Sequence, residues 1–458
     1  MKTINKIFYT FALISITVFT ACTTSDLDPT LEQDKDVEGS ITTPEDLYGV
    51  VKGAYNRMTS SSYYGRDFII HNECRTDNTY ANGNSGRFQT PSTFNYIPDN
   101  NPGIWTQAYR VIATANIIIA VDINTLDGDL EYAKHIQGQA YAIRALAHFD
   151  LLRQYGQQYI SGGNNVGIPY ITEFKGEDAF PSRKTADEVK SLIMLDLQTA
   201  FGLMDDAYFD SSKEFMSKYT AKALESKVAI YFGMWNEAKS AAKDVIDSGL
   251  YSIIPANDFV SSFAQDGSSN SIFELAFSEI DNLGGNSLGF IYRGDTYGDI
   301  EVLPNVLSLY EDGDVRANIL GYEDFAPTKL RNMGKYPELN GYDNVPIIRY
   351  EEVILNYAEA LFETGGDATT ELNKITSMRG ASEYASVTKE DILNERRKEL
   401  IFEGFRYDDY VRTGSPIVKV DFEQNISEDI PAGDYRMAMP IPIVEMDANS
   451  NMTQNINY

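Results

Sequence analysis

The sequence predicts a mainly α-helical protein whose helices pair as hairpins and carry long irregular loops. Apolar residues recur at intervals of three and four in several segments, for example at Trp105, Tyr109 and Ile112, and this spacing places them on one face of a helix. Polar segments rich in Asn, Gly, Ser and Tyr separate the helices, the longest at residues 60–103, 156–183, 255–345 and 413–440. Loops of this length are typical of binding surfaces.

Composition excludes several classes of protein. Of the 458 residues, 43% are hydrophobic and 23% are charged, which is a globular composition. The formal net charge of −29 argues against binding to nucleic acid, because phosphate contacts need a basic surface. It argues equally against electrostatic docking onto anionic lipid. With two Cys and three His in the chain, we expect no metal site, and no motif predicts a cofactor.

Residues 1–21 have the pattern of a secretion signal. Lys2 and Lys6 form a positive start, and Ile7 to Phe19 is an uncharged, mostly apolar run of 13 residues. As a helix this run would extend roughly 20 Å, too short for a hydrocarbon core of about 30 Å. We therefore expect residues 1–21 to be a cleaved signal peptide.

The four residues Phe19-Thr20-Ala21-Cys22 resemble a bacterial lipobox. The resemblance implies cleavage before Cys22 and acylation of Cys22, the only membrane attachment that we expect; the alternative is an ordinary signal peptide with a chance Cys. Residues 22–42 are polar and acidic, as in a flexible tether. We expect residues 43–458 to form a single binding domain, in which Cys74 is left without a disulfide partner.

Helical periodicity runs through six segments of this domain. They are residues 105–119, 141–152, 186–204, 220–249, 351–364 and 389–412. The clearest is 220–249, where two apolar faces are separated by Gly233-Met234 and small Ala residues would let the two helices pack closely. This pattern predicts a tetratricopeptide-like hairpin.

Two patterns that resemble enzyme signatures do not predict catalysis. Gly285 to Gly289 matches G-x-S-x-G, but the segment before it is polar and turn-like, and all three His residues precede it. A nucleophile elbow needs a buried strand before the Ser and a His after it.

Glu395, Glu399 and Glu403 recur every four residues, among Arg396, Arg397, Lys398 and Arg406. This arrangement favours ion pairing along a helix rather than paired catalytic carboxylates on two sides of a cleft. We therefore expect a protein that is not an enzyme.

Near the C-terminus the chain carries several distinctive segments. The segment EEVILNYAEALFETGG is followed by LNKITSMRG and by ILNERRKELIFEGFRYDDYVRTG, and the chain ends with PIPIVEMDANSNMTQNINY. These segments resemble the SusD/RagB family. Upstream, IWTQAYRVIATAN, QAYAIRALAHFDLLRQYG and RKTADEVKSLIMLDL also fit, so the resemblance covers nearly the whole chain after residue 21. Tyr410 stands where the family more often has Leu.

The resemblance implies a fold and a role. The fold would be mainly α, with tetratricopeptide-like helical hairpins forming a superhelical scaffold with long ligand-binding loops. The role would be that of an outer-membrane lipoprotein on the extracellular side, which captures oligosaccharides or oligopeptides. It would act as a lid and deliver them to its partner, a SusC-like TonB-dependent transporter.

The candidate ligand-binding residues lie on the irregular loops and combine aromatic rings with Arg, amide and carboxylate groups. One set is Tyr63, Tyr64, Arg66, Asp77, Asn78, Tyr80, Arg87 and Phe88, and the other is Tyr292, Arg293 and Tyr297. Tyr stacks on sugar faces and adds a hydrogen bond through its hydroxyl. The alternative is that the Tyr side chains anchor the loops and that the Arg side chains pair with acidic groups.

Two ligand classes remain open. Loops without Trp favour oligopeptides, as in a RagB-like receptor, whereas the family resemblance favours glycans. The negative net charge disfavours polyanionic glycans unless Arg66, Arg87 and Arg293 form a basic patch. A third class is a structural lipoprotein without a ligand.

Overall fold

The computed structural model describes residues 40–458, with the exception of residues 101, 159–161, 176–178 and 295–296. The expected signal peptide, Cys22 and most of the tether therefore lie outside the described residues. The unit from Thr43 to Tyr458 is separate in its contacts from Met1–Thr42.

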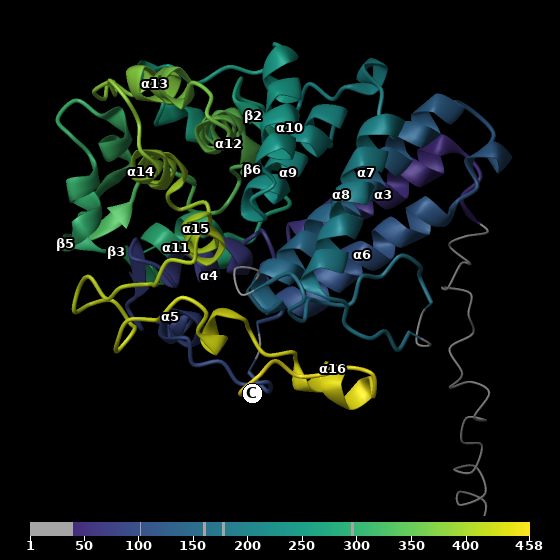
Figure 1. The fold of residues 1–458 in the computed structure, drawn as a ribbon, viewed down its shortest axis with the longest axis horizontal. Coiled ribbons are helices and arrows are strands. Elements are labelled where there is room, and N and C mark those ends of the chain that lie inside the picture. The colour runs from purple at the N-terminus through teal and green to yellow at the C-terminus, as the bar shows by residue number, and fades with distance from the viewer. Residues whose placement is uncertain (1–39, 101, 159–161, 176–178, 295–296) are drawn as a thin grey trace, which may run out of the picture. The chain divides into compact units, whose positions relative to one another are not determined.

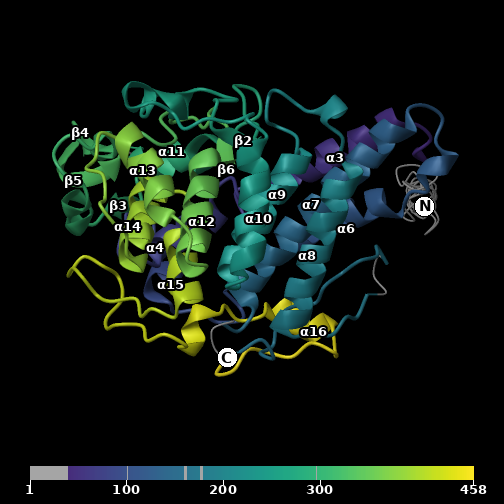
Figure 2. The same ribbon diagram turned by 45° about the horizontal axis from the view of Figure 1, so that its top comes forward.

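The predicted mainly α-helical fold is confirmed. The principal helices are α3 (Pro44–Met58), α6 (Ile104–Ala120), α7 (Leu130–Tyr155), α8 (Ala186–Leu203), α9 (Lys218–Tyr231), α10 (Trp235–Asp247), α12 (Tyr350–Glu363), α13 (Ala368–Met378), α14 (Lys389–Leu400) and α15 (Arg406–Thr413). From α6 to α10 each helix packs on the next, and α10 packs on α12, which packs on α13. Figures 1 and 2 show this succession as one tetratricopeptide-like array of helices lying side by side.

The hairpin predicted at 220–249 is formed by α9 and α10. Gly233 at the turn has φ +67°, a left-handed conformation that glycine adopts without a steric penalty. The buried face carries small side chains, including Ala221, Ala238 and Ala241. Ser217 begins α9 with a capping box to Thr220, which satisfies backbone N–H groups at the helix start.

The prediction of a single helix over 389–412 is wrong, because this segment forms two helices, α14 and α15. Between them Phe402 and Gly404 have φ +71° and +83°, which no α-helix contains. The Gly404 N–H donates to Glu73 Oε1 (2.8 Å), and its carbonyl accepts from Asn72 Nδ2 (3.0 Å). These long-range contacts stabilise the break, and local periodicity carries no signal of them.

Because of this break, the ion-pair partners of the glutamates differ from those expected for a single helix. Glu399 pairs with Arg379, Arg349 and Arg316. Glu403 lies beyond α14 and pairs with Lys335 and Arg349. The glutamates are thus engaged in ion pairs, as predicted, but most of their partners come from other segments and not from the Arg residues of the same helix.

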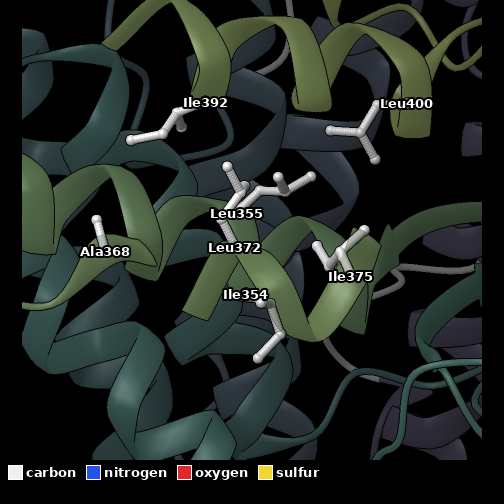
Figure 3. Close-up of a cluster of buried hydrophobic side chains, with 7 residues drawn as sticks. All are labelled: Ile354, Leu355, Ala368, Leu372, Ile375, Ile392 and Leu400. Atoms are coloured by element: carbon white, nitrogen blue, oxygen red, sulfur yellow. The ribbon is translucent and has the colours of Figure 1, made fainter. Parts of the chain in front are cut away.

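The core between α12, α13 and α14 is drawn in Figure 3. Its buried side chains are Ile354, Leu355, Ala368, Leu372, Ile375, Ile392 and Leu400. They come from three successive helices: α12 contributes the adjacent Ile354 and Leu355, α13 contributes three residues spaced by four and three, and α14 contributes two residues spaced by eight. Each helix thus turns apolar side chains to the same interior. Both Trp residues have a packing role, since Trp105 is buried and Trp235 packs against a second core cluster.

The segments predicted as irregular loops contain short elements. They are α4 (Asp67–Cys74), α5 (Gln89–Thr93), α11 (Leu288–Arg293), β1 (Thr79–Ala81), β2 (Ser271–Leu275), β3 (Ile300–Val302), β4 (Leu320–Glu323) and β5 (Ala326–Asn332). Two further short elements follow these segments: β6 (Val345–Arg349) begins at the end of 255–345, and α16 (Ile443–Ala448) comes after 413–440. Antiparallel pairs join β1 to β3, β2 to β6 and β4 to β5. The pairing of β1 with β3 brings the loop around residue 80 beside the loop around residue 300, although about half the chain separates them.

Within the described residues, no helix has the length and apolar character needed to cross a membrane. The same residues contain no group of three or more His, Cys, Asp or Glu side chains arranged to hold a metal ion.

Candidate functional site

A surface cavity of about 280 Å³ lies where the predicted loop residues meet. Its wall is formed by the start of α4, the segment that leads into α5, and residues near 100. The lining residues are Arg66, Asp67, His71, Gly86, Arg87, Phe88, Gln89, Thr90, Pro91, Asn100 and Pro102. Three of the predicted ligand-binding residues, Arg66, Arg87 and Phe88, are among them.

Two arginines at this cavity converge on one acceptor. Arg66 Nη1 donates to Asn286 Oδ1 at 2.6 Å, and Arg87 Nη1 donates to the same oxygen at 3.0 Å. Asn286 lies on the 3₁₀ turn that precedes α11, far from both arginines in sequence. One amide thus fixes both guanidinium groups at the cavity.

Each of these arginines also has a carboxylate partner. Arg66 Nε lies 2.6 Å from Asp67 Oδ1, and Arg87 Nη2 lies 3.0 Å from Asp299 Oδ2. Arg293, the third member of the basic patch considered above, pairs with Glu323 at 2.8 Å. The three positive charges are therefore neutralised locally, and they do not form an unpaired basic patch.

Phe88 supplies an aromatic wall under the two arginines. Its φ of +63° places it in the left-handed region, which a bulky side chain rarely adopts. The Arg66 and Arg87 guanidinium carbons lie 5.7 and 5.8 Å from the centre of its ring. The Arg87 carbon also lies 4.0 Å from the centre of the Tyr297 ring, so the two predicted sets of residues meet at this point.

Aromatic faces, amide groups and arginine donors at one cavity can bind a polyhydroxylated ligand. The rings pack against C–H surfaces, while the guanidinium and amide groups exchange hydrogen bonds with hydroxyls. The Arg87 side chain is 24% exposed, so part of it is accessible at the surface of the cavity.

Tyr63 and Tyr64 do not line this cavity and are buried. Tyr63 donates a hydrogen bond to Asp150 on α7, and the rings of Tyr63 and Tyr64 pack 4.6 Å apart beside Phe68. Burial, followed by the charge of Asp150, raises the pKa of both hydroxyls well above the usual value. Their position anchors the loop onto the scaffold.

Asp77 and Asn78 join the loop to the C-terminal motif. Asp77 pairs with Arg397 (2.9 Å) and with Arg406 (3.1 Å), and Asn78 accepts from Arg397 Nε (2.8 Å). Burial favours the neutral carboxyl, but the neighbouring Arg406 and Arg397 lower the pKa of Asp77 below its usual value.

The other predicted residues are held by the scaffold in the same way. Tyr80 on β1 donates to Glu301 on β3. Tyr292 on α11 is fully buried, stacks on Tyr336 and meets Phe402 edge to face. Ser287, the Ser of the G-x-S-x-G match, accepts from the Phe290 N–H at the start of α11 and donates to the Leu339 carbonyl.

Several residues of this region were not among the sequence predictions, and the most notable are His71, Asn286 and Asp299. His71 lies on the fully buried helix α4, which lacks amphipathic periodicity. Asn286 and Asp299 lie more than 190 residues from Arg87 along the chain, and only the folded structure brings them to it. One signal was available, because both lie in the polar, aromatic segment 255–345.

The fold and this cavity define a class of protein: a tetratricopeptide-like helical array that carries a loop-built cavity on its surface. Residues 215–458 match the model of the SusD family, and residues 27–230 match a model described as starch-binding associating with outer membrane. The chain belongs to the SusD family.

Named relatives and a solved structure are similar to this chain in sequence or fold. A SusD-like protein from Formosa agariphila is 25% identical, covering 91% of this chain and 93% of its own length. The starch-binding protein SusD from Bacteroides thetaiotaomicron is 26% identical over 38% of this chain and 31% of its own length. The crystal structure of a putative sugar binding protein from Bacteroides vulgatus is similar with a TM-score of 0.84, 29% identity, and coverage of 92% of this chain and 99% of the other.

Proposed function

We propose that this protein is a cell-surface nutrient-binding lipoprotein that captures oligosaccharides at the cavity between α4 and α5 and does not cleave them. Membership of the SusD family supports this role, and relatives carry names that describe starch or sugar binding. The residues at the cavity combine aromatic rings, an amide and arginines in the way that sugar recognition requires.

The observation that favours an uncharged glycan is the pairing of each arginine with a carboxylate. Asp67 and Asp299 neutralise Arg66 and Arg87, and the chain as a whole carries a net charge of −29. A polyanionic glycan would therefore meet a repulsive field without a compensating basic patch. We propose an uncharged oligosaccharide as the ligand.

A binding panel tests this proposal. Affinity electrophoresis in gels that contain starch, laminarin or polygalacturonate compares two neutral glucans with a polyanion. We expect retardation by a neutral polysaccharide and none by polygalacturonate. Retardation by polygalacturonate alone would contradict the neutral ligand, and binding of a mixed pool of short peptides without any polysaccharide would favour the peptide receptor instead.

The proposed partner is a SusC-like TonB-dependent transporter, over which the protein acts as a lid tethered through Cys22. The family match over residues 27–230, with its description of outer-membrane association, supports this location. Mass spectrometry of the native protein, extracted from its own outer membrane in mild detergent, should identify the transporter. A Cys22→Ser variant should lose the membrane attachment, whereas recovery of the wild-type chain without any partner would contradict the lid.

A further inference from the structure

His71 lies at the wall of the cavity. It is in the last turn of α4, four residues after Asp67, so both side chains lie on the same face of the helix. Both line the cavity. The His71 ring meets the Phe88 ring edge to face, with centroids 6.0 Å apart, which fixes its orientation.

The hydrogen-bonding state of His71 differs from that of the other two histidines. His71 is 5% exposed, its Nδ1 is buried without a partner, and the described residues make no hydrogen bond to either ring nitrogen. In contrast, His135 Nδ1 accepts from the Asp205 N–H (3.2 Å). His148 contacts the Arg144 carbonyl through Nδ1 (2.9 Å) and accepts from the Ile171 N–H through Nε2 (2.9 Å).

An unpaired polar group in the interior costs free energy, and native structures rarely keep one without a reason. Since His71 lines a cavity, a bound molecule is the natural source of its missing partner. The groups that face the ring are Asp67, Arg66 and Arg75, together with the Phe88 edge. Asp67 and Arg66 pair with one another, and Arg75 donates to the backbone carbonyl of His71, so none of them occupies the ring nitrogens.

The imidazole is uncharged at neutral pH. Burial lowers the pKa of His71 to about 4, with further lowering by Arg75 and Arg66 and an opposing effect of Asp67. A neutral imidazole presents one donor and one acceptor. A sugar hydroxyl can bond to either ring nitrogen, since its oxygen both donates and accepts.

We propose that His71 is a ligand-contacting residue that exchanges a hydrogen bond with a hydroxyl group of the bound oligosaccharide and so contributes to the choice of ligand. This proposal rests on the proposed function, because it places the oligosaccharide in the cavity that His71 lines. It adds a residue to the site that neither the sequence motifs nor the comparisons assign.

The small number of histidines makes a direct test possible. The chain contains three His residues, so labelling with ¹⁵N-histidine yields three imidazole spin systems, of which His71→Phe identifies one. On titration with starch- or laminarin-derived oligosaccharides, we expect the His71 ring signals to shift while those of His135 and His148 stay in place.

Affinity measurements on variants complete the test. His71→Phe keeps an aromatic ring against Phe88 and removes both nitrogens, and it should weaken binding about tenfold, the effect of one hydrogen bond. His71→Gln, which keeps a donor and an acceptor, should recover part of the loss. His135→Phe is the matched control, because it removes an equally buried imidazole away from the cavity and should leave the affinity unchanged.

The outcomes separate the two proposals. If the wild-type protein binds an oligosaccharide, but the His71 signals do not move and His71→Phe binds equally well, the role of His71 is overturned and the proposed function stands. If the wild-type protein binds no saccharide at all, the proposed function fails and the role of His71 fails with it.

Discussion

Arg379 and Glu399 form a bidentate ion pair in which neither side chain is exposed to solvent. Arg379 Nε donates to Glu399 Oε2 at 2.9 Å, and Nη2 donates to Oε1 at 2.8 Å. Arg379 ends α13 and Glu399 lies on α14, so the pair joins two helices of the array. Burial disfavours the charged carboxylate, but Arg379, Arg349 and Arg316 together lower the pKa of Glu399 far below its usual value.

Removal of Arg379 should destabilise the fold strongly. Arg379→Met leaves the buried Glu399 with fewer partners, and breaking a buried pair in this way costs about 3–5 kcal/mol of unfolding free energy. The matched control is Arg436→Met, which removes a bidentate pair with Asp434 whose side chains are 24% and 14% exposed and should cost less than about 1 kcal/mol. Urea denaturation measures both, and equal losses would contradict a special role for the buried pair.

Acid should unfold the protein through its buried carboxylates. Although burial opposes ionisation of Glu359, the ion pairs with Arg412, Arg396 and Lys389 lower its pKa from 4.5 to about 2. A carboxyl whose pKa is lowered by folding stabilises the folded state at pH values above the pKa of the same group in the unfolded chain. This contribution to stability is lost as the pH falls from about 4.5 to 2. For Glu359 the loss amounts to roughly 3 kcal/mol.

Denaturation midpoints between pH 7 and pH 2.5 measure this loss. Glu359→Gln should be less stable than the wild-type protein at pH 7 and should show a weaker dependence on pH below 4.5. A parallel pH dependence in the two proteins would show that Glu359 does not contribute.

The long helices could be predicted from the sequence because their signal is local. Apolar spacing located α6, α8 and α12 within about two residues, and the Gly233 turn between α9 and α10 was read from the glycine itself. The break at Phe402–Gly404 could not be predicted in this way. Its cause is the contact of Gly404 with Glu73 and Asn72, more than 300 residues away.

The candidate site was predictable in part for the same reason. Residue type and loop position pointed to Arg66, Arg87, Phe88 and Tyr297, which the structure brings together. Residue type alone does not show burial, so Tyr63 and Tyr292, chosen on the same grounds, lie in the interior. Asn286 was missed because its role depends on two arginines from a distant loop.

Loss of Asn286 should weaken ligand binding with little effect on stability. Asn286→Ala removes the oxygen that both Arg66 and Arg87 share, so the two guanidinium groups lose their common orientation. The residue is exposed, and a substitution there should change the unfolding free energy by about 0.5 kcal/mol or less. We expect at least a fivefold fall in affinity for the neutral glucan that the binding panel selects.

Asn282→Ala is the control for this variant. Asn282 lies four residues earlier and donates only to the Ser278 and Glu279 carbonyls, away from the arginines. Equal affinity of the two variants would show that the shared amide does not organise the cavity.

Gly404 should be the glycine whose replacement harms both stability and binding. At φ +83° any L-residue is strained by about 1–2 kcal/mol, and a Cβ at this position would lie 3.2 Å from Ile69 Cα and 3.4 Å from Asn72 Cβ on α4. Gly365→Ala is the matched control, since Gly365 has φ +75° but open space around it. Because α4 carries His71 and directly follows Arg66, displacement of this helix should weaken glycan binding only in Gly404→Ala. Affinity electrophoresis and thermal unfolding of both variants would measure these effects. If Gly404→Ala lost no more stability than Gly365→Ala and bound glycan normally, the close contact with α4 would not position the cavity.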